Sequence, residues 1–229
     1  AVIGSSNLPQ AAQGQIDVIQ SGIPAQFGDF TGGAINITTK GPSRMYRKSF
    51  EVFSSSMFDP YHINQAEASM SGPLVIKNKG GGDKEYVALG FQIAGNVNFS
   101  MDPSPLYGGS TVVSDEKLTE IEQNPLAPNP IGSGLTTRSS FLTEDDLITE
   151  KARQNVDRLV GVIQGKLEYQ PNQNSTITLF GSANYDRRKD YNRNQSLMNY
   201  KENREVIDQT YRTYLKFTQR LRSQNIDDT

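Results

Sequence analysis

The sequence predicts an all-β chain of long antiparallel strands, of the kind that forms a transmembrane β-barrel. Apolar and polar residues alternate along several segments, most clearly over residues 86–99. This segment exceeds the roughly five or six residues of an average globular strand and suits a tilted membrane strand of roughly nine to eleven. Short and long connections alternate between the segments, which is typical of bacterial barrels.

The composition fits this class. The mean hydropathy is −0.57, and no run approaches the roughly 18 apolar residues of a membrane helix, so residence in a membrane would require a barrel. Cysteine is absent, which excludes disulfides and cysteine-based metal sites and suits export through an oxidising periplasm. The net charge of −2 predicts no general nucleic-acid-binding surface.

The first element is a two-strand unit with the sequence IDVIQSGIPAQFGDFTGGAINITTKGP, residues 16–42. Residues 16–20 form a short strand-like run that ends at a turn containing Gly22 and Pro24. Glycines at 28, 32 and 33 permit backbone angles closed to other residues, and residues 34–40 then alternate as a second strand.

This unit resembles the C-terminal part of the plug domain of TonB-dependent outer-membrane receptors, and its TTKGP ending is most similar to the adhesin-like (Oar-type) branch of that family in Bacteroidota. The alternative from the motif alone is a pair of strands joined by a glycine-rich turn in a soluble sheet. The residues that carry the resemblance are Gly22, Pro24, Phe27, Gly28, Gly32, Gly33, Ile35, Ile37, Thr38 and Thr39.

The resemblance implies that residues 1–42 are the C-terminal part of a plug and that residues 43–229 form about six strands of a large, incomplete barrel. In that plug Ile35 and Ile37 would pack inside the sheet. A complete plug of the family is longer than the segment before residue 42, and the QNIDDT end resembles a turn. We therefore expect the chain to be an interior part of a longer protein.

Six segments after residue 43 alternate with a period of two, and we expect a strand at each. In residues 86–99 the apolar face carries Val87, Leu89, Phe91 and Ile93 and should meet lipid. The polar residues Gln92, Lys166, Arg212 and Lys216 should face the lumen or plug. The predicted strands are residues 49–56, 65–71, 86–99, 159–169, 176–185 and 210–221.

A soluble sheet with one wet face would alternate in the same way, so a β-sandwich binding module is an alternative. The connection lengths favour the barrel, because the short links KNKGGGD and QPNQNS alternate with the longer ones at 57–64, 100–158 and 186–209. Aromatic residues also stand near strand ends, as in the interfacial girdles of barrels. These are Tyr86, Phe99, Tyr169, Tyr185 and Tyr211.

The longest connection, residues 100–158, should carry structure of its own. Ser114 can cap a helix over DEKLTEIEQ, and Thr143 with Asp146 resembles a capping box that opens a second helix over EDDLITEKAR. The PLAPNPIGSG segment between them should be extended. A ligand-contacting loop over the barrel mouth and a packing elaboration are both open interpretations.

No enzymatic constellation, cofactor site or metal site is predicted. His62 is the single histidine and has no cysteine to share a zinc ion, and no serine stands in a nucleophile elbow. The glycines of KGGGDK lack the spacing of a phosphate-binding loop. The densest basic patch is predicted either to contact phosphates of lipopolysaccharide or to be a solvated loop. It consists of Arg187, Arg188, Lys189 and Arg193.

The resemblance implies active transport: a receptor in the cell outer membrane of a Gram-negative bacterium binds a substrate, here unknown, and an inner-membrane TonB complex pulls on the plug through an upstream segment. Outer-membrane lipid and lipopolysaccharide would be further partners. The alternative is a non-transporting barrel that acts in adhesion, or as a subunit of a surface or secretion assembly with a surface lipoprotein or secretion-complex partner.

Overall fold

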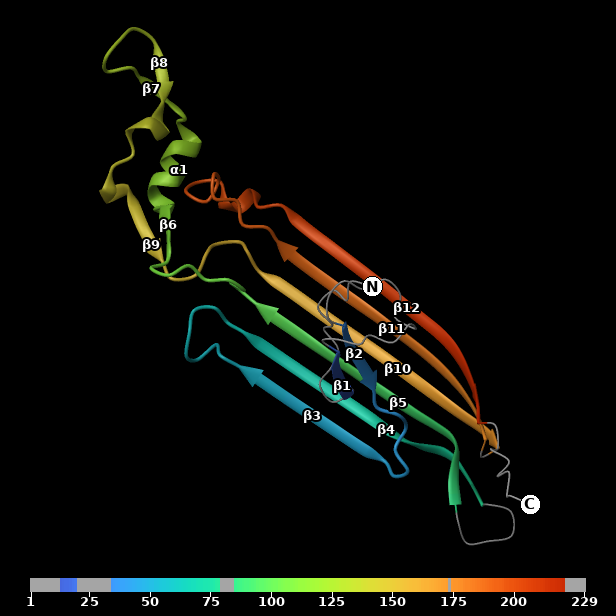
Figure 1. Cartoon of the computed structure of the whole chain (residues 1–229). Coiled ribbons are helices and arrows are strands. Elements are labelled where there is room, and N and C mark those ends of the chain that lie inside the picture. The colour runs from blue at the N-terminus through green and yellow to red at the C-terminus, as the bar shows by residue number, and fades with distance from the viewer. Residues whose placement is uncertain (1–12, 20–33, 79–84, 173, 221–229) are drawn as a thin grey trace, which may run out of the picture.

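The computed structural model describes residues 13–19, 34–78, 85–172 and 174–220, and most of them lie in antiparallel β-sheet (Figure 1). The main body is one six-stranded sheet in the order β12-β11-β10-β5-β4-β3. Neighbouring strands follow one another along the chain, so the sheet is a meander with β3 and β12 at its edges. Its strands are β3 (Arg47–Ser54), β4 (Asn64–Asn78), β5 (Glu85–Ser100), β10 (Arg158–Asn172), β11 (Ser175–Lys189) and β12 (Glu205–Gln219).

All six strands predicted after residue 43 are confirmed, and the structure corrects their lengths. The prediction for β4 stopped at residue 71, but the strand continues past Pro73 to Asn78. The register with β5 shifts between Pro73 and Val75 and again between Val75 and Ile76. A proline is tolerated inside a sheet at such an irregularity, because its missing N–H then leaves no gap in the ladder.

A separate two-stranded hairpin of β1 (Gln13–Ile19) and β2 (Ala34–Thr39) precedes the sheet. Its register pairs Ile16 with Ile37 and Val18 with Ile35, so both strands predicted for the two-strand unit are confirmed. The turn residues Gly22, Pro24, Phe27, Gly28, Gly32 and Gly33 lie outside the described residues. Ile35, Ile37, Thr38 and Thr39 lie in β2, where the backbone alone is described, so the predicted packing of the two isoleucines is untested.

Residues 101–157 connect β5 to β10 and form a small folded unit beyond one end of the sheet, which we call the insertion (Figure 1). Two short hairpin pairs, β6 with β9 and β7 with β8, flank one helix. The elements are β6 (Ser110–Val113), α1 (Asp115–Gln123), β7 (Leu126–Pro128), β8 (Leu135–Thr137), the 3-10 helices η3 (Arg138–Phe141) and η4 (Glu144–Asp146), and β9 (Leu147–Glu150). A further 3-10 helix, η5 (Tyr200–Glu202), lies between β11 and β12.

The insertion confirms one predicted helix and corrects the other. Helix α1 spans the predicted residues, although Ser114 caps it without a side-chain hydrogen bond. Thr143 and Asp146 do form the predicted capping box, but it opens the single turn η4 rather than a helix. The chain then enters β9, where Ile148 pairs with Val112 of β6. β-branched residues pack well in a sheet, and this pairing overrides the local helix signal.

The insertion has an apolar core, formed by Val112, Val113, Leu118, Ala152 and Val156, all at most 5% exposed. Residues 125–134 are free of helix as predicted, but the segment is extended only at Leu126–Pro128 and then bends into the turn that leads to β8. None of the helices in the described ranges is long and apolar enough to cross a membrane.

Candidate functional site

In its central strands β5 and β10, the six-stranded sheet exposes its apolar face and buries its polar face, whereas the edge strands β3 and β12 are exposed on both faces. In β5, Ile93 and Val97 are 45% and 51% exposed, whereas Gln92 and Asn96 on the opposite face are 6% and 8% exposed. A soluble sheet with one wet face has the reverse distribution, with the apolar side chains covered. The apolar surface of this sheet therefore requires an apolar surrounding.

The strand register carries this division across the whole sheet. Phe91 pairs with Leu167, which pairs with Leu179, which pairs with Leu215, so one apolar row crosses four strands. The grouping of Val87, Leu89, Phe91 and Ile93 on one face of β5 follows from the same continuous register. The exposed apolar side chains of this face include Phe50, Val52, Ile93, Val97, Ile163, Leu167, Tyr169, Leu179, Tyr211, Leu215 and Phe217.

The height of the apolar face matches a bilayer. The apolar residues of β10 extend from Leu159 to Tyr169, ten residue steps. At about 3.3 Å per step, a strand run of this length tilted by about 40° would have a height of roughly 25 Å, similar to the apolar band of a transmembrane barrel. Toward the end of the sheet away from the insertion, Tyr46 packs its ring where Gly72 lacks a side chain, with Phe91 at 6.4 Å between ring centroids.

The segment that leaves β2 begins on the polar face, and its last residue, Tyr46, packs on the apolar face. Lys166 donates from Nζ to the carbonyl oxygen of Lys40 at 3.3 Å. Pro42 lies so close to Gly90 that a Cβ on Gly90 would stand 2.5 Å from the Pro42 Cβ. A Cβ on Gly41 would stand 3.4 Å from Oε1 of Glu168. Two glycines thus allow this segment, residues 40–46, to approach β5 and β10 closely.

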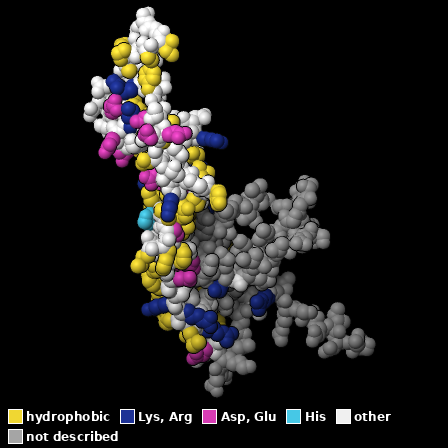
Figure 2. All heavy atoms as spheres, turned by 90° about the vertical axis from the view of Figure 1, so that its left-hand side faces the viewer, with side chains coloured by type: hydrophobic (Ala, Val, Ile, Leu, Met, Phe, Trp, Pro, Cys, Tyr) yellow, Lys and Arg dark blue, Asp and Glu magenta, His cyan; other side chains and the backbone are white. Residues whose placement is uncertain are grey.

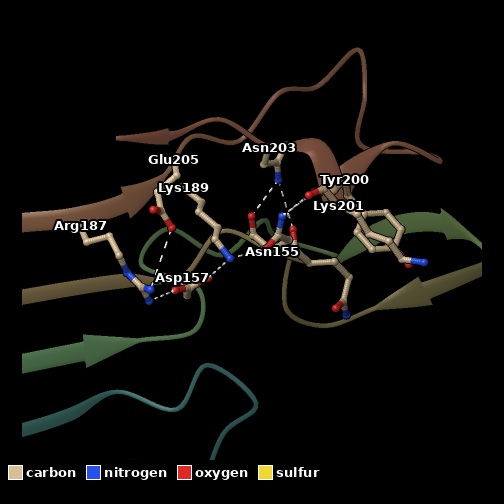
Figure 3. Close-up of polar contacts among 9 residues, drawn as sticks. Asn155, Asp157, Arg187, Lys189, Tyr200, Lys201, Asn203 and Glu205 are labelled. Atoms are coloured by element: carbon tan, nitrogen blue, oxygen red, sulfur yellow. Dashed lines mark hydrogen bonds and ion pairs between the residues drawn. The ribbon is translucent and has the colours of Figure 1, made fainter. Parts of the chain in front are cut away.

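Ion pairs tie the loop ends of β10, β11 and β12 together (Figure 3). Asp157 forms ion pairs with Arg187 at 2.7 Å and with Lys189 at 3.1 Å. Arg187 also approaches Glu205 at 4.0 Å, and Lys189 donates to Oδ1 of Asn155 at 2.7 Å. At the loop end of these strands, the positive charges of Arg187 and Lys189 are therefore neutralised by carboxylates and do not form a free positive surface.

The four residues of the predicted basic patch divide accordingly. Arg187 and Lys189 belong to the cluster just described, and Arg188 pairs with Asp208 and Asp190. Arg193 has no ion pair in the part of the chain that the structure describes. Of the four, Arg193 is thus the one whose charge has no ion-pair partner among the described residues. Contact of this patch with lipopolysaccharide stays a prediction.

A second set of contacts holds the loop between β11 and β12. Asn155, whose φ of 53° is in the left-handed region, donates from Nδ2 to the carbonyl oxygens of Tyr200 and Lys201 at 2.9 Å. The Asn203 side chain in turn donates a hydrogen bond from Nδ2 to the carbonyl oxygen of Asn155 at 2.9 Å. Asparagine tolerates the left-handed conformation better than most residues, so this exchange suits its side chain.

The buried pair of Asp102 and Arg153 was not predicted from the sequence. The Arg153 guanidinium also lies 4.8 Å over the ring centre of Tyr191, so the contact joins the insertion to the β11–β12 loop. Burial alone would raise the pKa of Asp102, but the side-chain and backbone hydrogen bonds from Arg153 outweigh it and lower that pKa below its usual value. The partners are 51 positions apart, and no sequence pattern links them.

Among the described residues, no group of three or more His, Asp or Glu side chains is placed to hold a metal ion. His62 lies in the β3–β4 loop, where its backbone N–H donates to Asp59. Comparison of the chain with family models, with curated proteins and with solved structures gave no match.

Proposed function

We propose that this chain is part of a TonB-dependent outer-membrane transporter. In this proposal the six-stranded sheet is a section of barrel wall in the outer membrane, and residues 1–42 are the end of the plug. The observation that carries the proposal is the reversed distribution in the central strands: their apolar side chains are exposed, their polar side chains are buried, and the segment that leaves β2 contacts the polar face.

Energetics support a bilayer around the sheet. Each apolar side chain left in water forgoes about 1.5–3 kcal/mol relative to burial, so a face with more than ten exposed apolar residues is unfavourable in water. Lipid tails remove this cost. On the other face, Gln164 and Asn96 are buried, as expected for polar wall residues that face a plug.

The sheet edges support a larger wall. β3 and β12 each have one neighbour among the described strands, so both carry a row of backbone groups without a strand partner. A bilayer has no water to satisfy such groups, and strands that span it must close into a barrel. A barrel of about 22 strands leaves a wide lumen, which a plug would fill.

The proposed transport cycle assigns a role to the segment 40–46. A substrate would bind near the insertion and the β11–β12 loop, and force from the inner-membrane complex would then pull the plug. The contacts of Lys40, Gly41 and Pro42 with β5 and β10 anchor the C-terminal end of the plug to the wall. The plug can thus rearrange while this end stays attached.

The proposal is tested in the organism with the full-length gene. We expect the protein in the outer-membrane fraction, and we expect a gene deletion to abolish the uptake of at least one medium component in a complementable way. Dissipating the proton-motive force should remove the difference between the strains. An outer-membrane protein whose deletion changes no energy-dependent uptake would contradict transport.

One observation favours a second function, adhesion or a role in a surface assembly. The insertion has its own core and projects beyond the sheet, as a recognition unit would (Figure 1). In that case deletion should reduce surface attachment or release a surface partner, and dissipating the proton-motive force should leave this effect unchanged. Recovery of the protein in the soluble fraction would contradict both functions.

A further inference from the structure

A cavity of about 780 Å³ lies between the segment 40–46 and the polar face of β3, β4 and β5. Three basic residues line it on this face: Lys40 and Arg44 from the segment, and Arg47 from the start of β3. Lys48, the next residue of β3, pairs with Met70 on the apolar face. No acidic residue is among its lining residues. Basic side chains also gather near this end of the sheet in Figure 2, away from the insertion.

These cations differ from the other basic clusters of the molecule. Arg187, Arg188 and Lys189 at the loop end are matched with carboxylates, whereas none of the three cavity cations, Lys40, Arg44 and Arg47, has an ion pair within the described ranges. Like charges around one cavity repel one another, over a screening length of about 8 Å at physiological salt. An anion in the cavity would relieve this repulsion.

Neutral hydrogen-bond donors complete the lining. The register places Arg47 beside Ser71 and Ser71 beside Gln92, so three polar side chains form a row across β3, β4 and β5. Ser49 and Ser69 form the adjacent row and share a hydrogen bond of 2.7 Å. Hydroxyl donors beside guanidinium and ammonium groups are typical of sites for phosphate oxygens.

We propose that this cavity binds a phosphate group, carried either by a soluble phosphorylated molecule or by a phospholipid headgroup. Arg44 and Arg47 supply forked donors, Lys40 supplies charge, and the serines supply neutral donors. The cavity is several times larger than a single phosphate ion, so the phosphate is part of a larger molecule. This inference depends on the cavity lining and not on the proposed transport.

The test uses the full-length protein, purified in mild detergent and moved into nanodiscs of phosphatidylcholine, with tripolyphosphate as the probe in calorimetry. The variant Arg44→Gln/Arg47→Gln removes two exposed cations of the cavity. The control Arg193→Gln/Lys201→Gln removes two exposed cations of the β11–β12 loop and changes the net charge equally. We expect the first variant to weaken binding about tenfold or more and the control to change it less than about twofold.

A second arm separates the two sources of phosphate. Phosphatidylglycerol is added to the nanodiscs, and the binding of tripolyphosphate is measured again. If a headgroup occupies the cavity, the added lipid weakens probe binding to the wild type about tenfold; if the ligand is soluble, the lipid leaves binding unchanged. Both results require the loss in Arg44→Gln/Arg47→Gln and support the proposal.

Two results would overturn the phosphate site. One is equal binding of tripolyphosphate to the wild type and to Arg44→Gln/Arg47→Gln in phosphatidylcholine nanodiscs. The other is tighter binding of a poly-glutamate peptide than of tripolyphosphate, since this would identify the cavity as a site for an acidic protein segment. Circular dichroism of both variants confirms that the sheet is intact.

Discussion

Arg153 donates from Nη2 to Oδ1 of Asp102 at 2.7 Å and from its backbone nitrogen to Oδ2 at 2.9 Å. Asp102 is completely buried, and Arg153 is 8% exposed. The pair connects the beginning of the insertion to its end, close to where the chain leaves β5 and enters β10. Its loss should therefore loosen the insertion while leaving the sheet paired.

We expect Asp102→Asn to destabilise the insertion by about 3 kcal/mol, because breaking a buried pair leaves the Arg153 charge without its partner. Limited proteolysis of the full-length protein should show cleavage within residues 101–157 about a hundredfold faster. Glu120→Gln serves as the control, since it breaks exposed pairs with Lys117 and Arg138 and should cost less than about 1 kcal/mol. Equal cleavage rates in the two variants would contradict a structural role for Asp102.

The lowered pKa of Asp102 predicts how the insertion responds to acid. A carboxyl that binds protons more weakly in the native state than in the unfolded state stabilises the fold above its unfolded pKa of about 4. This contribution should be lost as the pH falls through the lowered native value. Hydrogen-exchange protection of the insertion, measured from pH 6 to pH 3, should decline in the wild type. The Asp102→Asn variant should lack this part of the decline.

The close approach of Pro42 to Gly90 predicts a sharp effect of a single methyl group. In Gly90→Ala the new Cβ would collide with the rigid Pro42 ring, so we expect a loss of about 1–3 kcal/mol. Gly161→Ala is the matched control in β10, because nothing lies within 4 Å of its added Cβ. Thermal unfolding of the full-length protein in detergent measures both. A Gly90→Ala midpoint equal to that of Gly161→Ala would show that the segment does not rest on β5.

The orientation of the sheet can be measured with single cysteines, since the chain has none of its own. Fluorescent labels at Val87, Leu89, Phe91 and Ile93 should be quenched by a lipid-soluble quencher in the reconstituted full-length protein. Labels at Gln92, Lys166, Arg212 and Lys216 should be protected. Quenching of the second group in place of the first would reverse the assignment of the two faces.

The 229-residue chain, expressed alone, should aggregate in water. Both sheet edges offer unpaired backbone groups, and the apolar face far exceeds the few hundred Å² of contiguous apolar surface usual for a soluble monomer. Light scattering and analytical ultracentrifugation test this directly. A soluble monomer with one cooperative thermal transition would contradict the barrel and favour a β-sandwich.

Period-two alternation was sufficient to predict the main strands, because each strand separates one apolar from one polar environment. It failed where pairing continues through an irregularity, as at Pro73, and where a local capping signal competes with a distant strand, as at Thr143. Helix α1 was predicted with its correct bounds because its ends carry local signals, Ser114 before it and Asn124 with Pro125 after it.

The contacts at the loop end were beyond prediction for a physical reason. Whether Arg187 meets Asp157 or stays free depends on the register of β10 against β11, and that register is set by side chains distributed along both strands. The same holds for the cavity, where Arg47 and Ser71 become neighbours through strand pairing. The sequence analysis did not single out the basic residues near 40–48, because their gathering around one cavity depends on this pairing.

The pairing of Ser110 with Glu150 changes the chain entropy of assembling the sheet. For β5 to meet β10, the ends of residues 101–157 must come together, and the entropic cost of this closure grows with the length of free chain. Once β6 and β9 pair, only residues 101–109 and 151–157 remain to be ordered, which lowers the cost by about 1 kcal/mol. An insertion that folds first would thus act as a preformed hairpin turn, bringing β3–β5 and β10–β12 together as two halves.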